Sequence, residues 1–238
     1  MNKLIEIQSV TAAYDAKPVL RDVSLTLCEN DFLGVVGPNG GGKTTLLKVI
    51  LRLLKPSRGQ VVFYAGGHPV PSLAIGYLPQ VNRMDRRFPV SVGEVVASGL
   101  MSEKRPLRGF SAVQRQRIAD TLEWAGLGGM AGRPIGDLSG GELQRALLGR
   151  AIVSHPKVLI LDEPNTYVDR RFASRLYDLL AEVNRDAAVI LVSHDVGAVL
   201  PLVKNVAYVD GTLRYHAGNR PTEAWLDGTH GSIPPHGV

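Results

Sequence analysis

The sequence predicts an α/β fold whose buried parallel sheet carries a helical insert. Three short apolar runs, over residues 32–36, 158–161 and 188–192, have the composition of strands buried on both faces of a parallel sheet. A helical apolar pattern over 171–184 joins the second run to the third, and this strand–helix–strand order is typical of α/β sheets. The middle of the chain, 91–127, has helical periodicity instead, which indicates the insert.

The composition of the 238 residues, 45% hydrophobic and 21% charged, is typical of a soluble globular chain of one or two domains. Its 26 glycines, 15 prolines and single cysteine exclude collagen-like, disordered and disulfide-stapled classes. Cys28 has no second cysteine to pair with, which fits a reducing cytosol. Because no apolar run approaches about 18 residues and the N-terminus has no apolar leader stretch, we expect neither a membrane span nor a signal peptide.

The net charge of +5 is concentrated in one segment, 81–117. This basic segment holds eight basic residues against three acidic ones, so the rest of the chain is balanced. The basic residues are Arg83, Arg86, Arg87, Lys104, Arg105, Arg108, Arg115 and Arg117. A basic chain taken as a whole suggests nucleic acid or an anionic membrane surface as partner, whereas a local excess indicates one charged face.

The first third of the chain is expected to form strands and one helix. Apolar residues open a strand at 4–7, and apolar and polar residues alternate over 23–28, the period-two pattern of a half-buried strand. The buried run 32–36 leads into a glycine-rich turn. A helical stretch, 43–54, follows this turn and ends at a Lys-Pro pair.

Two further helices and a tail are expected downstream. Ser111 and Gln114 form a capping box at the start of a helix in the insert. The apolar stripe of that helix consists of Ile118, Leu122 and Ala125. The helix at 171–184 collects on one face Leu176, Leu179, Leu180 and Val183. Residues 219–238 lose periodicity, and we expect a mobile tail there.

Residues 37–44 match the pattern G-x-x-x-x-G-K-[ST] between a predicted strand and a predicted helix. They are Gly37, Pro38, Asn39, Gly40, Gly41, Gly42, Lys43 and Thr44. Consecutive glycines let several backbone N–H groups face one phosphate chain at the positive end of a helix dipole. Lys43 can then reach the β- and γ-phosphates, and the Thr44 hydroxyl can ligate Mg²⁺. The alternative is a glycine-rich turn that only caps the helix.

Two carboxylates, Asp162 and Glu163, follow the apolar run 158–161, at the carboxyl end of a predicted strand, where α/β sheets bind ligands. Asp162 suits the Mg²⁺ shell, through an intervening water. Because side chains alternate along a strand, Glu163 points elsewhere and is available to orient and polarise an attacking water. The alternative is a solvated strand end with no chemical role.

The segment 138–142, Leu-Ser-Gly-Gly-Glu, is expected to start a helix. Ser139 and Glu142 form a capping box, a device that many helices use. Gly140 and Gly141 in the first turn weaken the helix by roughly 1 kcal/mol each relative to alanine, which makes sense if another molecule approaches the backbone closely. Since a helix N-terminus with free N–H groups attracts anions, the segment is also a candidate second phosphate site.

In this order along the chain, the motif at 37–44, the segment 138–142 and the sequence Leu-Asp-Glu-Pro at 161–164 resemble the nucleotide-binding subunit of an ATP-binding cassette (ABC) transporter. The likeness covers about residues 3–216, and the five-residue signature at 138–142 is highly specific to that family. It implies a P-loop NTPase core with a mixed or parallel sheet, an N-terminal antiparallel β subdomain and an inserted α-helical subdomain.

The domain division that the resemblance implies is discontinuous. The catalytic core is expected to comprise 1–82 and 156–218. The helical subdomain that carries the signature is expected at 83–155, and the tail at 219–238.

The resemblance also implies roles for single residues. Tyr14 matches the aromatic residue that stacks on adenine, and Thr45 belongs to the ATP-binding loop. Gln80 matches the glutamine that contacts Mg²⁺ and links the core to the insert. Asp169 matches an aspartate that works across a dimer, and His194 matches the switch histidine that contacts the γ-phosphate.

The implied mechanism needs two copies of the chain. ATP on one copy is covered in trans by Ser139, Gly140, Gly141 and Glu142 of the second, so two chains sandwich two nucleotides. Every catalytic position that the family requires is filled. We therefore expect an ATPase that uses Mg²⁺ and whose dimer loosens on hydrolysis.

One P-loop and no membrane span imply a separate ATPase subunit, peripheral on the cytoplasmic face of a bacterial-type inner membrane. Its expected partners are integral membrane permease subunits and, indirectly, a substrate-binding protein. Patterns at 39–45, 88–100 and 163–169 resemble the zinc/manganese class of metal-ion importers. Iron-chelate and cobalamin importers share some of these patterns and stay an alternative. The basic segment is expected to meet acidic permease loops or anionic lipid, with a solvated face as the alternative.

Other functional classes fit less well. The six histidines lack the spacing of a metal cage. A soluble ABC protein acting on ribosomes or DNA usually carries two cassettes or a long coiled-coil insert, and neither is present, so no nucleic-acid partner is expected. A regulatory ATP-binding module would lack the base, whereas Glu163 is present.

Overall fold

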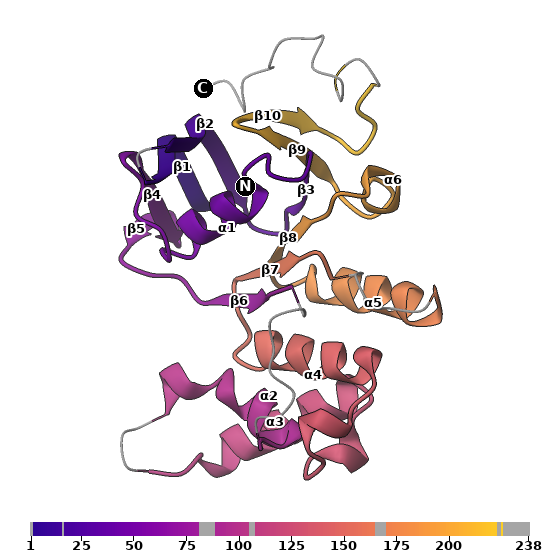
Figure 1. Cartoon of the computed structure of the whole chain (residues 1–238). Helices are drawn as coiled ribbons and strands as arrows, with labels where there is room; N and C mark the ends of the chain where they lie inside the picture. Colours follow the sequence, from indigo (N-terminus) through magenta and orange to yellow (C-terminus); the bar gives the residue numbers. More distant parts are fainter. Residues whose placement is uncertain are drawn as a thin grey trace.

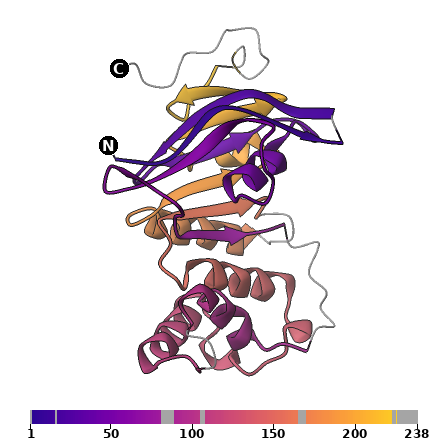
Figure 2. The same cartoon turned by 90° about the vertical axis from the view of Figure 1, so that its left-hand side faces the viewer.

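The computed structural model describes residues 2–15, 17–80, 89–104, 108–164, 170–222 and 225. The described strands form two sheets, and the helices of the middle third gather beyond the edge strand of the larger one, at the bottom of both views (Figures 1 and 2). An insert between two strands of one sheet therefore stands apart as a helical layer, as expected.

The smaller sheet is antiparallel and has the strand order β2-β1-β4-β5. Its strands are β1 (Lys3–Tyr14), β2 (Lys17–Cys28), β4 (Arg58–Ala65) and β5 (His68–Val70). The alternation expected over 23–28 is confirmed, because Val23, Leu25 and Leu27 are buried while the residues between them are exposed or half-buried.

The larger sheet has the order β10-β9-β3-β8-β7-β6 and is parallel except for the edge strand β10. Its strands are β3 (Phe32–Val36), β6 (Ile75–Leu78), β7 (Val158–Asp162), β8 (Ala188–Val192), β9 (Asn205–Asp210) and β10 (Thr212–Ala217). The three strands expected from apolar runs, β3, β8 and β7, are neighbours in its interior and are buried throughout.

Successive residues of β7 and β8 belong to different hydrophobic cores. On β7, Leu159 and Leu161 face one core, while Val158 and Ile160 face the other. The first core is shared with the helical insert and with α5 (Arg170–Val183), and the second lies between the two sheets and includes α1 (Lys43–Ile50). A strand covered on both faces explains why these sequences are continuous apolar runs.

In the part that the structure describes, the insert between β6 and β7 contains three helices and short 3-10 turns. They are α2 (Val92–Ser98), η2 (Met101–Glu103), α3 (Ala112–Trp124), η3 (Gly128–Met130), η4 (Ile135–Asp137) and α4 (Gly140–Ile152). Each of the three helices begins with a serine capping box, from Ser91, Ser111 and Ser139. The boxes expected at Ser111 and Ser139 are confirmed, and the one at Ser91 adds a third.

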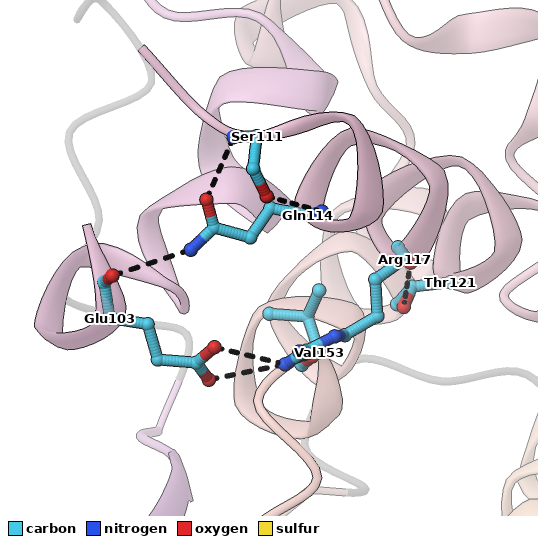
Figure 3. A network of polar contacts seen from close by, with 6 residues as sticks. All are labelled: Glu103, Ser111, Gln114, Arg117, Thr121 and Val153. Atoms are coloured by element: carbon cyan, nitrogen blue, oxygen red, sulfur yellow. Dashed lines mark hydrogen bonds and ion pairs between the residues drawn. The ribbon is translucent and has the colours of Figure 1, made fainter. Parts of the chain in front are cut away.

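A polar network ties the parts of the insert together (Figure 3). The Arg117 guanidinium on α3 donates to both carboxylate oxygens of Glu103 at 3.1 and 3.2 Å and to the Val153 carbonyl at 3.5 Å. The Gln114 amide donates to the Glu103 carbonyl at 3.4 Å. Part of the basic charge of the segment 81–117 is thus used inside the insert.

The first helix differs from its expected length. It was expected over 43–54, but α1 ends at Ile50, with Leu51 as its C-cap. Arg52 takes a left-handed φ of 57°, and its guanidinium lies 4.4 Å from the centroid of the Phe63 ring while donating to the Pro71 carbonyl. This tertiary contact on the smaller sheet ends the helix before the Lys-Pro pair.

Several expectations fall on parts of the chain outside the described residues. They are Arg83, Arg86, Arg87 and Arg105 of the basic segment, Asp169, and most of the tail. Within the tail, Trp225 is described and is only 4% exposed, a burial that the loss of periodicity did not predict. The helices that the structure describes are all too short or too polar to cross a bilayer.

Gly76 lets β6 and α4 meet at backbone distance, since a Cβ at this position would overlap the Ala151 carbonyl oxygen. Gly76→Ala should therefore lower the free energy of unfolding by about 1–3 kcal/mol, measured by urea denaturation of the full chain. The matched control is Gly132→Ala, where a Cβ meets nothing within 4 Å. Equal stability of the two variants would contradict this account of the contact.

Candidate functional site

The glycine-rich loop connects β3 to α1 and has a backbone that glycine alone adopts readily. Gly37, Gly40 and Gly42 have φ values of 142°, 81° and 104°. Pro38, Asn39 and Gly40 are exposed, whereas Gly37, Gly41 and Gly42 are buried. The loop thus turns its middle outward and keeps its two ends inside the fold.

The buried ends of the loop pack on the turn between β9 and β10. The Gly211 N–H donates to the Gly41 carbonyl at 2.9 Å, and the Arg21 N–H donates to the Gly211 carbonyl at 2.8 Å. A Cβ on Gly37 would overlap the Val209 carbonyl oxygen, and one on Gly41 would lie 2.6 Å from it. The loop is therefore held by backbone against backbone.

Lys43 is folded back over the loop. Its ammonium donates to the Gly37 carbonyl at 2.8 Å and to the Pro38 carbonyl at 2.9 Å, and the residue is 6% exposed. Burial lowers the pKa of Lys43, while the nearby carboxylates Glu163 and Asp162 act in the opposite direction. A buried cation thus lies at the loop, in the field of both acidic residues that the sequence singled out.

The N-terminus of α1 differs from those of α2, α3 and α4. Its N-cap is Gly42, which has no side chain, and the described first turn contains no acidic residue. The three helices of the insert satisfy the same N–H groups with serine and Glu or Gln. A helix end without a side-chain cap, next to a lysine, has the properties of an anion-binding site.

The two carboxylates are placed differently at the end of β7. Asp162 is the last residue of the strand and is 6% exposed. Glu163 leaves the strand with a left-handed φ of 51°, and its N–H donates to the Val192 carbonyl at 3.0 Å. A non-glycine residue in this region is strained, and such strain clusters at functional sites. The backbone thus turns Glu163 away from the direction of Asp162.

Gln80, Glu163 and His194, which come from three separate parts of the sequence, meet at one carboxylate. The Gln80 amide nitrogen donates to Glu163 Oε2 at 3.1 Å, and His194 Nδ1 lies 3.2 Å from Glu163 Oε1. Because an ionised carboxylate only accepts hydrogen bonds, this contact requires a proton on Nδ1. Glu163 is 17% exposed and His194 59%, so the pair faces solvent on the histidine side.

Tyr14, the predicted adenine platform, ends β1 close to α1. Its side chain is 40% exposed. Lys48 on α1 donates to its hydroxyl at 3.1 Å, and the Lys48 ammonium lies 5.3 Å from the ring centroid. The ring is therefore available at the surface and is tied to the helix that starts in the glycine-rich loop.

The signature segment starts α4, as predicted. The Ser139 hydroxyl accepts from the Glu142 N–H at 3.3 Å, and the Glu142 carboxylate accepts from the Ser139 N–H at 2.8 Å. These bonds to Ser139 hold the pKa of Glu142 below its usual value. Ser139 is exposed, and a Cβ on Gly141 would meet nothing within 4 Å, so space for another molecule remains beside the first turn.

The glycine-rich loop and the signature segment begin helices on opposite faces of the larger sheet. Leu46 and Leu47 of α1 pack in the core that includes Val158 and Ile160, whereas α4 packs in the core that includes Leu159 and Leu161. Figures 1 and 2 both show α4 on the far side of β6 and β7 from α1.

The remaining predicted residues are located as follows. Thr44 is exposed in the first turn of α1, and Thr45 is 6% exposed. Asp169 lies outside the described residues. The residues that sequence reasoning missed are Lys48 beside Tyr14, Arg133, whose guanidinium lies 3.8 Å from the Glu142 carboxylate, and the Val209–Gly211 turn. The Asp-Gly pair at 210–211 is a hairpin signal, but it does not tell which loop the hairpin touches.

Known proteins resemble this chain over most of its length. A family model described as "ABC transporter" matches residues 20–166. The zinc import ATP-binding protein ZnuC of Pasteurella multocida is 37% identical over 199 residues, which cover 83% of this chain and 69% of that protein. The zinc uptake system ATP-binding protein ZurA of Listeria innocua is 37% identical over 215 residues, 88% of this chain and 84% of the relative. A probable metal transport system ATP-binding protein of Thermotoga maritima is 34% identical over 223 residues, which cover 93% of this chain and 86% of that protein.

Solved structures confirm the predicted fold. An inward-facing metal-chelate type ABC transporter, itself described as putative, superimposes with a TM-score of 0.84 at 24% identity, covering 96% of this chain and 88% of that one. The dimeric ATP-binding cassette MJ0796, in a post-hydrolysis state with ADP and phosphate, gives a TM-score of 0.77 at 25% identity, covering 92% and 100%. The matched family model, these relatives and the shared fold together show that the chain belongs to the ABC transporter family, as one of its ATP-hydrolysing subunits.

Proposed function

We propose that this ATPase powers the import of a metal cation of the zinc, manganese or iron class through a separate membrane permease. The observation that carries the catalytic part is the Glu163 carboxylate, held by Gln80 and His194 beside the glycine-rich loop. The cargo is proposed from the relatives, since ZnuC and ZurA are named for zinc import and uptake.

The loop binds the phosphate chain of ATP through its backbone and Lys43. The ammonium of Lys43 now donates to two neutral carbonyls, those of Gly37 and Pro38. Phosphate oxygens offer it charged acceptors instead, and charge-assisted hydrogen bonds are about twice as strong as neutral ones. The N–H groups at the start of α1 add the favourable end of the helix dipole. Tyr14, at the end of β1 and in contact with Lys48 of the same helix, stacks on the adenine.

Glu163 orients and polarises the attacking water. The Gln80 amide and His194 Nδ1 each contact one of its oxygens, which fixes the plane of the carboxylate. His194, which is the more exposed partner, is placed to contact the γ-phosphate from the solvent side. Because the proton on Nδ1 is used by Glu163, the other ring nitrogen is the atom left for that contact.

The residues around the loop fit a magnesium ion. Thr44 offers a hydroxyl, Asp162 a carboxylate at the strand end, and Gln80 the amide oxygen that Glu163 does not use. These are hard oxygen donors, the kind that Mg²⁺ prefers. Bound there, Mg²⁺ supplies positive charge to the β- and γ-phosphates.

The catalytic unit is a dimer in which Ser139, Gly140, Gly141 and Glu142 of one copy cover the ATP of the other. Two observations support this proposal. The signature segment begins a helix on the opposite face of the sheet from α1, and an exposed serine and an open glycine flank its first turn. Asp169 is proposed to act across the same dimer interface.

The permease partner defines the place of the subunit. We assign it to the cytoplasmic face of a bacterial-type membrane, as a peripheral subunit that receives no cargo itself, while a substrate-binding protein delivers the cation outside. The division into a core of 1–82 and 156–218 and a helical subdomain of 83–155 stays part of this proposal. Import of an iron chelate or of cobalamin, which shared sequence patterns left open, is not favoured by the relatives, since these are named for zinc import and uptake.

Glu163→Gln should reduce ATP turnover by about 100-fold or more, because it removes the general base while keeping the size of the side chain. ATP binding should persist, and size-exclusion chromatography with ATP should show a dimer. The matched control is Glu29→Gln, at a carboxylate that contacts the Asn2 side chain near the N-terminus. Normal turnover in Glu163→Gln would refute its assignment, and a monomer in ATP would refute the sandwich.

Ser139→Ala should abolish ATP-dependent dimerisation and hydrolysis, whereas Ser111→Ala should leave both intact. The two serines occupy the same position in equivalent capping boxes, so each change costs its helix about 1 kcal/mol. Thermal unfolding of both variants checks that the structural loss is alike. If Ser111→Ala impaired the ATPase as much as Ser139→Ala, the loss would come from the helix and not from contact with nucleotide.

Uptake of radioactive zinc, manganese and ferrous iron, measured in the native host lacking this gene, tests the cargo. The wild-type gene should restore uptake of one of these cations, and the Glu163→Gln gene should not. Labelled cobalamin and an iron chelate serve as the other arms. Restored uptake of either of these, with no change for the free cations, would overturn the metal-cation assignment while leaving the ATPase in place.

A further inference from the structure

The position of the glycine-rich loop depends on the hairpin formed by β9 and β10. At Gly37 and Gly41 no side chain separates the loop from the hairpin. The Gly211 N–H also donates a hydrogen bond to the Gly41 carbonyl. A shift of the hairpin would therefore be transmitted to the loop without a flexible group to absorb it.

Tyr208 connects the hairpin to the strand that enters the loop. On β9 it pairs with Val36, the residue immediately before Gly37, and across the hairpin it pairs with Arg214 on β10. The Arg214 guanidinium carbon lies 4.6 Å from the centroid of the Tyr208 ring. The end of the hairpin nearest the loop thus carries a stacked Arg–Tyr pair, on the face of the sheet opposite α1.

Trp225 completes this stack from outside the sheet. The Arg214 guanidinium lies 5.5 Å from its ring centroid and donates to its backbone carbonyl at 2.7 Å. The Tyr208 and Trp225 rings meet edge to face, with 6.3 Å between their centroids. The centroid of the His216 ring lies 5.2 Å from that of Trp225. Arg214 therefore lies against two aromatic rings that also touch each other, and each cation–π contact stabilises by about 0.5–2 kcal/mol.

Trp225 is deeply buried. It is 4% exposed, and its backbone N–H donates to Thr222 at 3.0 Å. Within the described chain its indole N–H has no hydrogen-bond partner, so the ring is held by packing and by Arg214. It shares its hydrophobic core with Val199 and Val203, in and just after the helix α6 (Val196–Val199) that follows His194.

We propose that Trp225 is a positioning residue for nucleotide binding: it clamps Arg214 onto Tyr208, and so fixes the β9–β10 hairpin that holds the glycine-rich loop. The inference rests on nucleotide binding by that loop, as proposed above. Trp225 itself touches no nucleotide. Its loss should loosen the loop and weaken ATP binding, while the group that activates water, Glu163, stays in place on β7.

The test compares two single variants of the whole 238-residue chain, in each of which one of the two tryptophans is changed to alanine. Trp225→Ala should raise the KM for ATP by about three- to tenfold, the equivalent of one lost cation–π contact, with kcat little changed. Trp124→Ala is the matched control, since Trp124 lies on α3, donates to Glu182 at 3.2 Å and belongs to the helical insert. It should leave the KM unchanged.

Two conservative variants keep the test informative if Trp225→Ala unfolds. Trp225→Phe should have a KM for ATP near that of the wild type, because it keeps an aromatic ring beside Arg214. Arg214→Lys keeps the charge but loses the planar fork, and should raise the KM as Trp225→Ala does. The double variant Trp225→Ala/Arg214→Lys should have the same KM for ATP as either single variant, because both changes break the same contact.

Amide hydrogen exchange over residues 37–42 gives a readout independent of turnover. It should be faster in Trp225→Ala and unchanged in Trp124→Ala. Equal KM and equal exchange in the two alanine variants would overturn the inference, as would a change in kcat alone. A wild-type chain that fails to bind ATP would overturn the proposed function itself, so the two failures are distinguishable.

Discussion

The burial of β7 on both faces is the constraint on which the rest of the structure depends. Its residues alternate between two hydrophobic cores, so each face must be covered by something apolar. One face receives α1 and the antiparallel sheet, and the other receives α5 and the insert. The strand that ends in the two carboxylates is therefore fixed from both sides, and the glycine-rich loop and the signature segment are separated because they begin helices of different layers.

The local physics at the two phosphate-binding candidates is opposite. The signature helix satisfies its first N–H groups with its own side chains, as do the two other helices of the insert. The helix after the glycine-rich loop has no such group and is preceded by a glycine with φ of 104°. A capped helix end can be presented to a partner without cost, whereas an uncapped one next to a buried lysine favours an anion.

Much of the fold follows from patterns in the sequence, because those patterns record burial. The runs at 32–36, 158–161 and 188–192 became central strands, and the capping boxes at Ser111 and Ser139 formed. The predicted end of α1 was four residues too late, because Arg52 turns out of the helix to stack on Phe63. No local pattern contains that contact. For the same reason the resemblance gave Gln80, Glu163 and His194 separate roles but not their meeting at one carboxylate, and the Trp225 stack was not expected at all.

The capping box of Ser139 has a consequence for the speed of the catalytic cycle. Its hydroxyl oxygen already accepts from the Glu142 N–H, so the proton of that hydroxyl is the part left to donate outward. In the proposed dimer a phosphate oxygen can take this proton's hydrogen bond while the inward bond persists. Clamping and release then require no unwinding and rewinding of a helix turn. Each round of hydrolysis can proceed by the approach and separation of two preformed surfaces, free of a local refolding step.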